Sequence, residues 1–148
     1  MTFSRALFTA LFTALPLLAA CASPTQPAPD AAGCHVIAYT GWSDGRASSQ
    51  RLVRLYGDSI EQPRYGTEPG LIVRPVPPDD ADYTGLWFWK KAGPRSLTIW
   101  QGGGFVGQVE TLAFDGTLWR GSATIWTDMV GYDVTATATM APAGCPAT

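Results

Sequence analysis

Residues 104–127 read GFVGQVETLAFDGTLWRGSATIWT, and this stretch decides the fold class. Two runs rich in β-branched and aromatic residues, 104–114 and 117–127, flank the pair Asp115-Gly116. Asp-Gly between two strand-like runs favours a two-residue type I′ turn, because both central residues of that turn need positive φ angles. The stretch therefore predicts a β-hairpin, two antiparallel strands joined by a tight turn.

The same pattern of short apolar runs and turn residues continues through the rest of the chain beyond residue 33. No segment there keeps the spacing of apolar residues that an amphipathic helix needs. Gly93-Pro94 and the run Gly102-Gly103-Gly104 mark two further short connections. The sequence thus predicts eight strands, at residues 34–42, 50–57, 70–76, 84–90, 95–101, 104–114, 117–127 and 132–140.

The overall composition is that of one small domain. The chain has 148 residues, of which 15% are charged, and its formal net charge is −2. A surface that binds nucleic acid needs an excess of basic side chains, so we expect no nucleic-acid partner. One His and three Cys leave few groups for metal binding or nucleophilic catalysis.

Residues 1–20 are typical of a secretion signal, in which Arg5 precedes an apolar run too short to span a membrane. The run ends in Leu18-Ala19-Ala20-Cys21, which resembles the lipobox of bacterial lipoproteins at all four positions. The resemblance implies cleavage before Cys21 and lipidation of its thiol, which anchors the protein to a membrane. The residue after Cys21 is Ala22 and not Asp. By the same resemblance, the absence of Asp at this position implies an outer-membrane location facing the periplasm.

Residues 21–33 contain three prolines and no large apolar side chain, which predicts an extended tether before a folded domain at residues 34–148. Cys34 and Cys145 lie at opposite ends of that domain. In an exported protein an even pair of cysteines favours a disulfide, which would bring the two Cα atoms within about 7 Å. Two free thiols or a redox pair are the alternative.

Short connections between successive strands are typical of an antiparallel meander. With its first and last strands joined by a disulfide, an eight-stranded meander is expected to close into an up-and-down barrel, which removes exposed sheet edges. The topology resembles that of lipocalins and avidins, which implies an interior filled by side chains or by one small ligand. The sequence thus predicts an all-β, eight-stranded antiparallel barrel; the alternative is a two-sheet β-sandwich.

Strands of a meander run alternately up and down, so every second connection lies at the same end of the barrel. The end that holds Cys34 and Cys145 is called here the disulfide end, and the opposite end the distal end. Trp42, Trp100 and Trp126 fall at strand ends near the distal end, where they could stack on a ligand or a partner protein. Trp119 would line an inner cavity. These four tryptophans are the predicted binding residues; the alternative is that they plug and pack a small barrel.

No catalytic or metal motif fits its context. Gly41-Trp42-Ser43-Asp44-Gly45 matches Gly-x-Ser-x-Gly, but no helix follows it, and the only histidine, His35, precedes Ser43. Asp79, Asp80 and Asp82 crowd one connection without the spacing of a Ca²⁺ loop, so we interpret them as a solvated acidic loop. We therefore expect no enzyme activity, no metal and no cofactor.

The leading hypothesis is a lipid-anchored cell-envelope barrel that binds a small hydrophobic ligand or an envelope component. The alternatives are a protein–protein module, such as a periplasmic inhibitor of lysozyme or of a protease, and a structural envelope lipoprotein. A ligand binder is expected to keep a cavity lined by Trp89 or Trp119. An inhibitor is expected to have a filled barrel and a protruding loop, for which residues 57–69 and 77–83 are the candidates.

Overall fold

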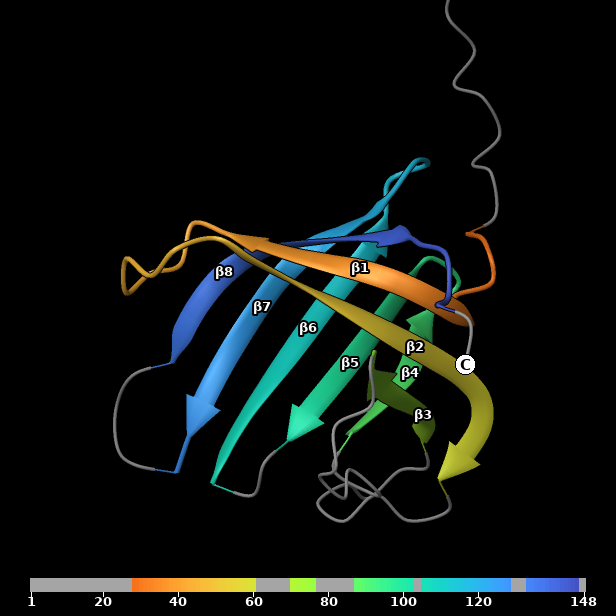
Figure 1. Ribbon diagram of the computed structural model, residues 1–148, viewed down its shortest axis with the longest axis horizontal. Helices are drawn as coiled ribbons and strands as arrows, with labels where there is room; N and C mark the ends of the chain where they lie inside the picture. The colour runs from red at the N-terminus through yellow and green to blue at the C-terminus, as the bar shows by residue number, and fades with distance from the viewer. Residues whose placement is uncertain (1–27, 61–69, 77–86, 103–104, 129–132, 147–148) are drawn as a thin grey trace, which may run out of the picture.

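The computed structural model describes residues 28–60, 70–76, 87–102, 105–128 and 133–146. These residues form eight antiparallel strands that close into one barrel in the order of the sequence (Figure 1). The strands are β1 (Gly33–Thr40), β2 (Ser49–Ile60), β3 (Gly70–Pro75), β4 (Trp87–Gly93), β5 (Ser96–Gly102), β6 (Val106–Phe114), β7 (Trp119–Thr127) and β8 (Val134–Pro142). The predicted barrel is thus confirmed, and the alternative two-sheet sandwich is excluded.

Strand β1 closes the barrel, because it pairs with β2 on one side and with β8 on the other. Ile37 lies opposite Arg51 of β2 and opposite Met140 of β8. Each of the eight described strands therefore has two hydrogen-bonded neighbours. Closure of this kind removes the open sheet edges through which β proteins aggregate.

A disulfide joins Cys34 in β1 to Cys145 after β8, as the sequence predicted, and the two Cα atoms are 5.3 Å apart. The amide nitrogen of Ala143 donates a hydrogen bond of 2.9 Å to the carbonyl oxygen of Cys34. Backbone pairing between the two chain segments thus continues up to the covalent bond. Because the cross-link spans a sequence separation of 111 residues, it stabilises the fold by about 4–5 kcal/mol in the chain-entropy model.

The hairpin around Asp115-Gly116 is confirmed, but its predicted turn type is wrong. Phe114 pairs with Trp119, so the loop comprises residues 115–118 rather than two residues. Only the glycine has a positive φ angle, whereas a type I′ turn needs two such residues. The Asp115 carboxylate explains the longer loop, because its Oδ1 accepts 2.8 Å hydrogen bonds from the backbone N–H groups of Thr117 and Leu118.

Strand β2 runs further than predicted, to Ile60 instead of Gly57. Its pairing with β3 shifts register between Leu55 and Ser59, which is the signature of a bulge or similar irregularity. Glycine in a strand weakens regular pairing and commonly marks such a place. The sequence signal for an end at Gly57 therefore marked an irregularity inside a longer strand.

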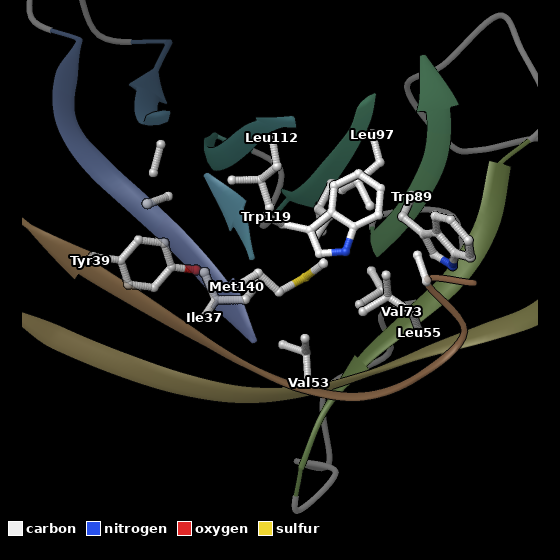
Figure 2. Packing of buried hydrophobic residues seen from close by; sticks show 14 of the residues in the cluster. Ile37, Tyr39, Val53, Leu55, Val73, Trp89, Leu97, Leu112, Trp119 and Met140 are labelled. Atoms are coloured by element: carbon white, nitrogen blue, oxygen red, sulfur yellow. The ribbon is translucent and has the colours of Figure 1, made fainter. Parts of the chain in front are cut away.

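Alternate residues of each strand point inward and fill the barrel. Figure 2 shows side chains from several strands, Trp89 and Trp119 among them, converging on the barrel axis. The largest fully buried apolar side chains are Trp89, Ile37, Leu55, Leu97, Ile99, Leu112, Met140, Val53 and Val73. Burying one such side chain contributes roughly 1.5–3 kcal/mol, so this cluster carries much of the stability.

The chain that leads into β1 packs against the core at the disulfide end. Ala31 is 0% exposed and belongs to the core cluster, and Ala28 packs against it. The described end of the predicted tether therefore packs on the barrel. His35 is also buried here, and burial lowers its pKa while Nδ1 lies 3.2 Å from the carbonyl oxygen of Gly33.

Candidate ligand-binding site

A pocket of about 240 Å³ opens at the distal end of the barrel, where β4 begins, β5 ends and β6 begins. Its polar lining residues are Arg51, Gln101 and Gln108. Its apolar lining residues are Trp87, Val106 and Ile125, and Gly102 and Gly107 complete the wall. Sites for drug-sized ligands measure about 300–1,000 Å³, so this pocket suits a smaller molecule.

Beneath the pocket lies a carboxyl group, that of Glu110, which is 0% exposed. Its Oε1 accepts hydrogen bonds from the Tyr39 hydroxyl at 2.7 Å, from Gln101 Nε2 at 2.5 Å and from Gln108 Nε2 at 2.7 Å. Gln101 and Gln108 are opposite each other on β5 and β6. The side-chain amides of Gln101 and Gln108 are therefore held in place by hydrogen bonds to one buried carboxyl group.

Arg51 connects this buried network to the mouth of the pocket. Its Nη1 donates a hydrogen bond to Oε1 of Gln101, and its guanidinium carbon lies 5.3 Å from the centroid of the Trp87 ring. A guanidinium at this distance from an indole ring is held by cation–π attraction. A continuous chain of polar contacts thus runs from the exposed Arg51, through Gln101, to the buried Glu110.

The electrostatics of the network follow from its burial. Burial raises the pKa of Glu110, while its three hydrogen bonds and the charge of Arg51 act in the opposite direction. Burial, and then the charge of Glu110, raise the pKa of Tyr39, so its hydroxyl stays protonated and donates. The second carboxyl oxygen of Glu110, Oε2, is buried and has no hydrogen-bond partner among the residues that the structure describes. An unpartnered buried oxygen of this kind costs about 1–3 kcal/mol.

Trp42 follows β1 and covers the interior beside this network. It is buried, and its ring centroid lies 5.6 Å from that of Tyr39 and 5.2 Å from the guanidinium carbon of Arg46. The next residue, Ser43, donates its backbone N–H to the Thr135 carbonyl and accepts the Thr135 N–H on its hydroxyl oxygen. The serine of the Gly-x-Ser-x-Gly match therefore fastens the end of β1 to β8.

The other three predicted tryptophans lie elsewhere. Trp100 is on the outer surface, stacked on Phe88 at a centroid distance of 5.8 Å, and Trp126 covers Gly107 from outside. Trp119 is inside the barrel, but it packs against Phe114 near the disulfide end at 5.5 Å. The structure thus does not bring the four tryptophans together, and none of them lines the pocket.

Sequence reasoning missed the pocket residues Arg51, Trp87, Gln101 and Gln108, together with Glu110. A signal was present in β6, where Glu110 alternates in phase with Leu112 and Phe114. A carboxylate on the apolar face of a strand is costly to bury unless it has hydrogen-bond partners. That position therefore pointed to an interior polar network before any partner was known.

No protein-family model matches the chain, and no curated protein or solved structure matches it either. Within the described ranges, no helix is long and apolar enough to cross a membrane. In the same ranges, no group of three or more His, Cys, Asp or Glu side chains could hold a metal ion. Cys21, the acidic residues 79–82 and most of the loops 57–69 and 77–83 lie outside the described residues.

Proposed function

We propose that the protein is a lipid-anchored binding module of the bacterial cell envelope that takes a small ligand into its distal pocket. The anchor is inferred from the lipobox resemblance at residues 18–21, which implies an outer-membrane location facing the periplasm. The ligand site is inferred from the barrel. Its interior is packed over most of its length, and the pocket lies at the distal end.

The observation that carries this proposal is the fixed polar floor of the pocket. Gln101 and Gln108 line the pocket, and each donates to the same buried Glu110 oxygen. Their side chains are therefore ordered before any ligand arrives, which lowers the entropic cost of binding. Apolar walls with a few fixed polar groups are the usual composition of small-molecule sites.

The size of the pocket limits the ligand. A volume of 240 Å³ equals the liquid volume of about eight water molecules at ~30 Å³ each. The core below is filled by Leu97, Ile99 and Leu112, so a long acyl chain cannot pass down the axis. The proposal therefore narrows the expected hydrophobic ligand to a compact molecule with both apolar and polar parts.

A second candidate function, a protein–protein module, is favoured by the surface beside the pocket. Phe105 is 78% exposed and Val106 is 50% exposed at the start of β6. An exposed aromatic residue next to a small pocket is a typical arrangement at the centre of a protein interface. In this second reading, a side chain of the partner occupies the pocket.

Native mass spectrometry of the full-length protein, extracted from the envelope in mild detergent, tests the first proposal. We expect an added mass that denaturation releases. Ile125→Trp fills the pocket, so this variant should lose the added mass. Ser122→Trp changes the outer face of the same strand and should keep the added mass. A wild-type protein of bare mass would contradict the ligand proposal and favour the protein–protein module.

A further inference from the structure

We propose that the distal pocket recognises the carboxylate of a small organic acid with an apolar body, and that Arg51 is the residue that selects it. This inference rests on the proposed function, because it assumes that the pocket is a ligand site. It adds the chemical class of the ligand and the residue that determines specificity.

The hydrogen bonding of Arg51 favours an anionic ligand. A guanidinium group has five N–H donors. In the described part of the chain, Arg51 donates to the neutral amide oxygen of Gln101 rather than to a carboxylate. Among the residues that the structure describes, the other N–H groups of Arg51 have no hydrogen-bond partner. Two parallel N–H groups of a guanidinium match the two oxygens of a carboxylate.

The guanidinium group of Arg51 is held in position at the pocket. Stacking on Trp87 and the bond to Gln101 hold it at the wall of the pocket from two directions. An arginine that is already ordered loses less conformational entropy when it binds an anion than a free surface arginine does. The guanidinium group of Arg51 is thus already positioned at the wall of the pocket before a ligand binds.

Charge around the pocket favours an anion. Among the described residues, the buried carboxyl group of Glu110 contacts Tyr39, Gln101 and Gln108 and reaches Arg51 only through Gln101. The ion pairs of the described residues join Arg46 to Asp44 and Arg120 to Asp115, and none of them uses Arg51. A ligand carboxylate would balance the charge of Arg51, and a ligand cation would be repelled.

The apolar walls of the pocket favour a ligand whose acid group is attached to an apolar body. Val106 and Ile125 form apolar walls beside the arginine, so an acid with a small apolar body gains burial that acetate alone would not. The pocket volume excludes a long fatty acid. The chemistry points to a compact acid such as a benzoate-sized molecule.

Equilibrium dialysis of the full-length protein in detergent, with benzoate and benzamide as the two probes, tests this assignment. The probes are similar in shape and differ in charge. We expect benzoate to bind at least ten-fold more tightly than benzamide, and Arg51→Gln to remove that preference. Arg54→Gln is the matched control, because Arg54 is on the same strand and lies over Tyr56 instead. Arg51→Lys should restore part of the preference, which would show that the loss in Arg51→Gln is not due to misfolding.

Three outcomes distinguish the two proposals. If both probes bind equally and Ile125→Trp abolishes both, the selection of acids is wrong while the ligand site stands. If benzoate binds but Ile125→Trp does not weaken it, its site lies elsewhere and the assignment to Arg51 is wrong. If neither probe binds to the wild-type protein, the acid assignment is again wrong. The native mass measurement then decides whether the pocket holds another ligand.

Discussion

The hydroxyl of Tyr39 donates a 2.7 Å hydrogen bond to Oε1 of Glu110, and this contact joins β1 to β6 across the inside of the barrel. The two strands are not neighbours in the sheet. The bond therefore braces the barrel at the level just beneath the pocket. The two residues that it joins are 71 positions apart in the sequence.

Tyr39→Phe should lower the free energy of unfolding by about 1–3 kcal/mol, because it removes one of three donors to a buried carboxyl group. Glu110→Met, which has no oxygen that could accept this bond, tests in the same background whether the effect belongs to this pair. Urea denaturation of the four proteins in the double-mutant cycle should give a coupling energy of about 1 kcal/mol. Additive effects of the two substitutions would contradict a direct interaction.

The contribution of Glu110 to the stability of the folded protein should fall as the pH rises from about 4.5. Burial raises the pKa of Glu110 in the folded state above its ordinary value of 4.5. Between the unfolded and folded pKa values, the folded protein therefore holds a proton that the unfolded chain has released, and rising pH favours unfolding. Urea titrations across this range should show that the stability of the wild-type protein relative to that of Glu110→Gln declines with pH, because the opposite effect of the buried His35 is common to both proteins. Equal slopes would contradict the raised pKa.

Replacing both Cys34 and Cys145 by Ser should cost about 2–5 kcal/mol of stability, because the unfolded chain regains the entropy that the cross-link removes. Thermal unfolding of the oxidised and reduced wild-type protein, beside the double variant, measures this. The reduced protein and the double variant should unfold at similar temperatures. An unchanged melting temperature on reduction would show that the bond contributes nothing.

Gly107→Ala should displace Trp126 from the outer surface of β6. A Cβ atom at Gly107 would lie 2.3 Å from Cζ2 of Trp126, so the indole ring must move. We expect a loss of about 1–3 kcal/mol and greater quenching of tryptophan fluorescence by iodide. Gly144→Ala is the control, because a Cβ there meets no atom within 4 Å. Equal behaviour of the two variants would show that Trp126 is not held against the strand.

Cys21→Ser should move the protein from the membrane fraction to the soluble periplasm, because serine cannot receive the lipid that the lipobox resemblance implies. Cell fractionation followed by immunoblotting measures the distribution. Cys34→Ser provides the control, since it changes a cysteine of the barrel and leaves residues 18–21 intact. Continued membrane attachment of Cys21→Ser would contradict a lipid anchor at that residue.

The strands and their closure could be predicted from local signals. Asp115-Gly116 located one hairpin, and two cysteines at the ends of one domain required its first and last strands to meet. Both signals depend on near neighbours in the sequence or on a covalent constraint. The turn type at 115–118 could not be predicted, because it depends on how one carboxylate satisfies two backbone N–H groups.

The pocket could not be assembled from the sequence, because its residues come from five strands. Their meeting depends on the register of every pairing between them. Of the predicted binding tryptophans, Trp119 packs near the disulfide end and Trp100 lies outside the barrel, so neither lines this pocket. Glu110 on an apolar face was the more informative residue, because burying a carboxyl group requires a compensating network.

Because Ala31 is buried at the disulfide end, the chain between a lipid anchor and the barrel is short, and this limits the distance between the barrel and the membrane. If Cys21 carries the lipid, the chain from there to Ala28 can extend at most about 25 Å, since each residue spans no more than ~3.6 Å. A tether of that length would keep the disulfide end within about 25 Å of the bilayer, and the pocket, at the opposite end of the barrel, would remain open to the aqueous space. A ligand would then arrive by diffusion through water rather than by lateral transfer from the surrounding lipid, which suits a charged, soluble molecule.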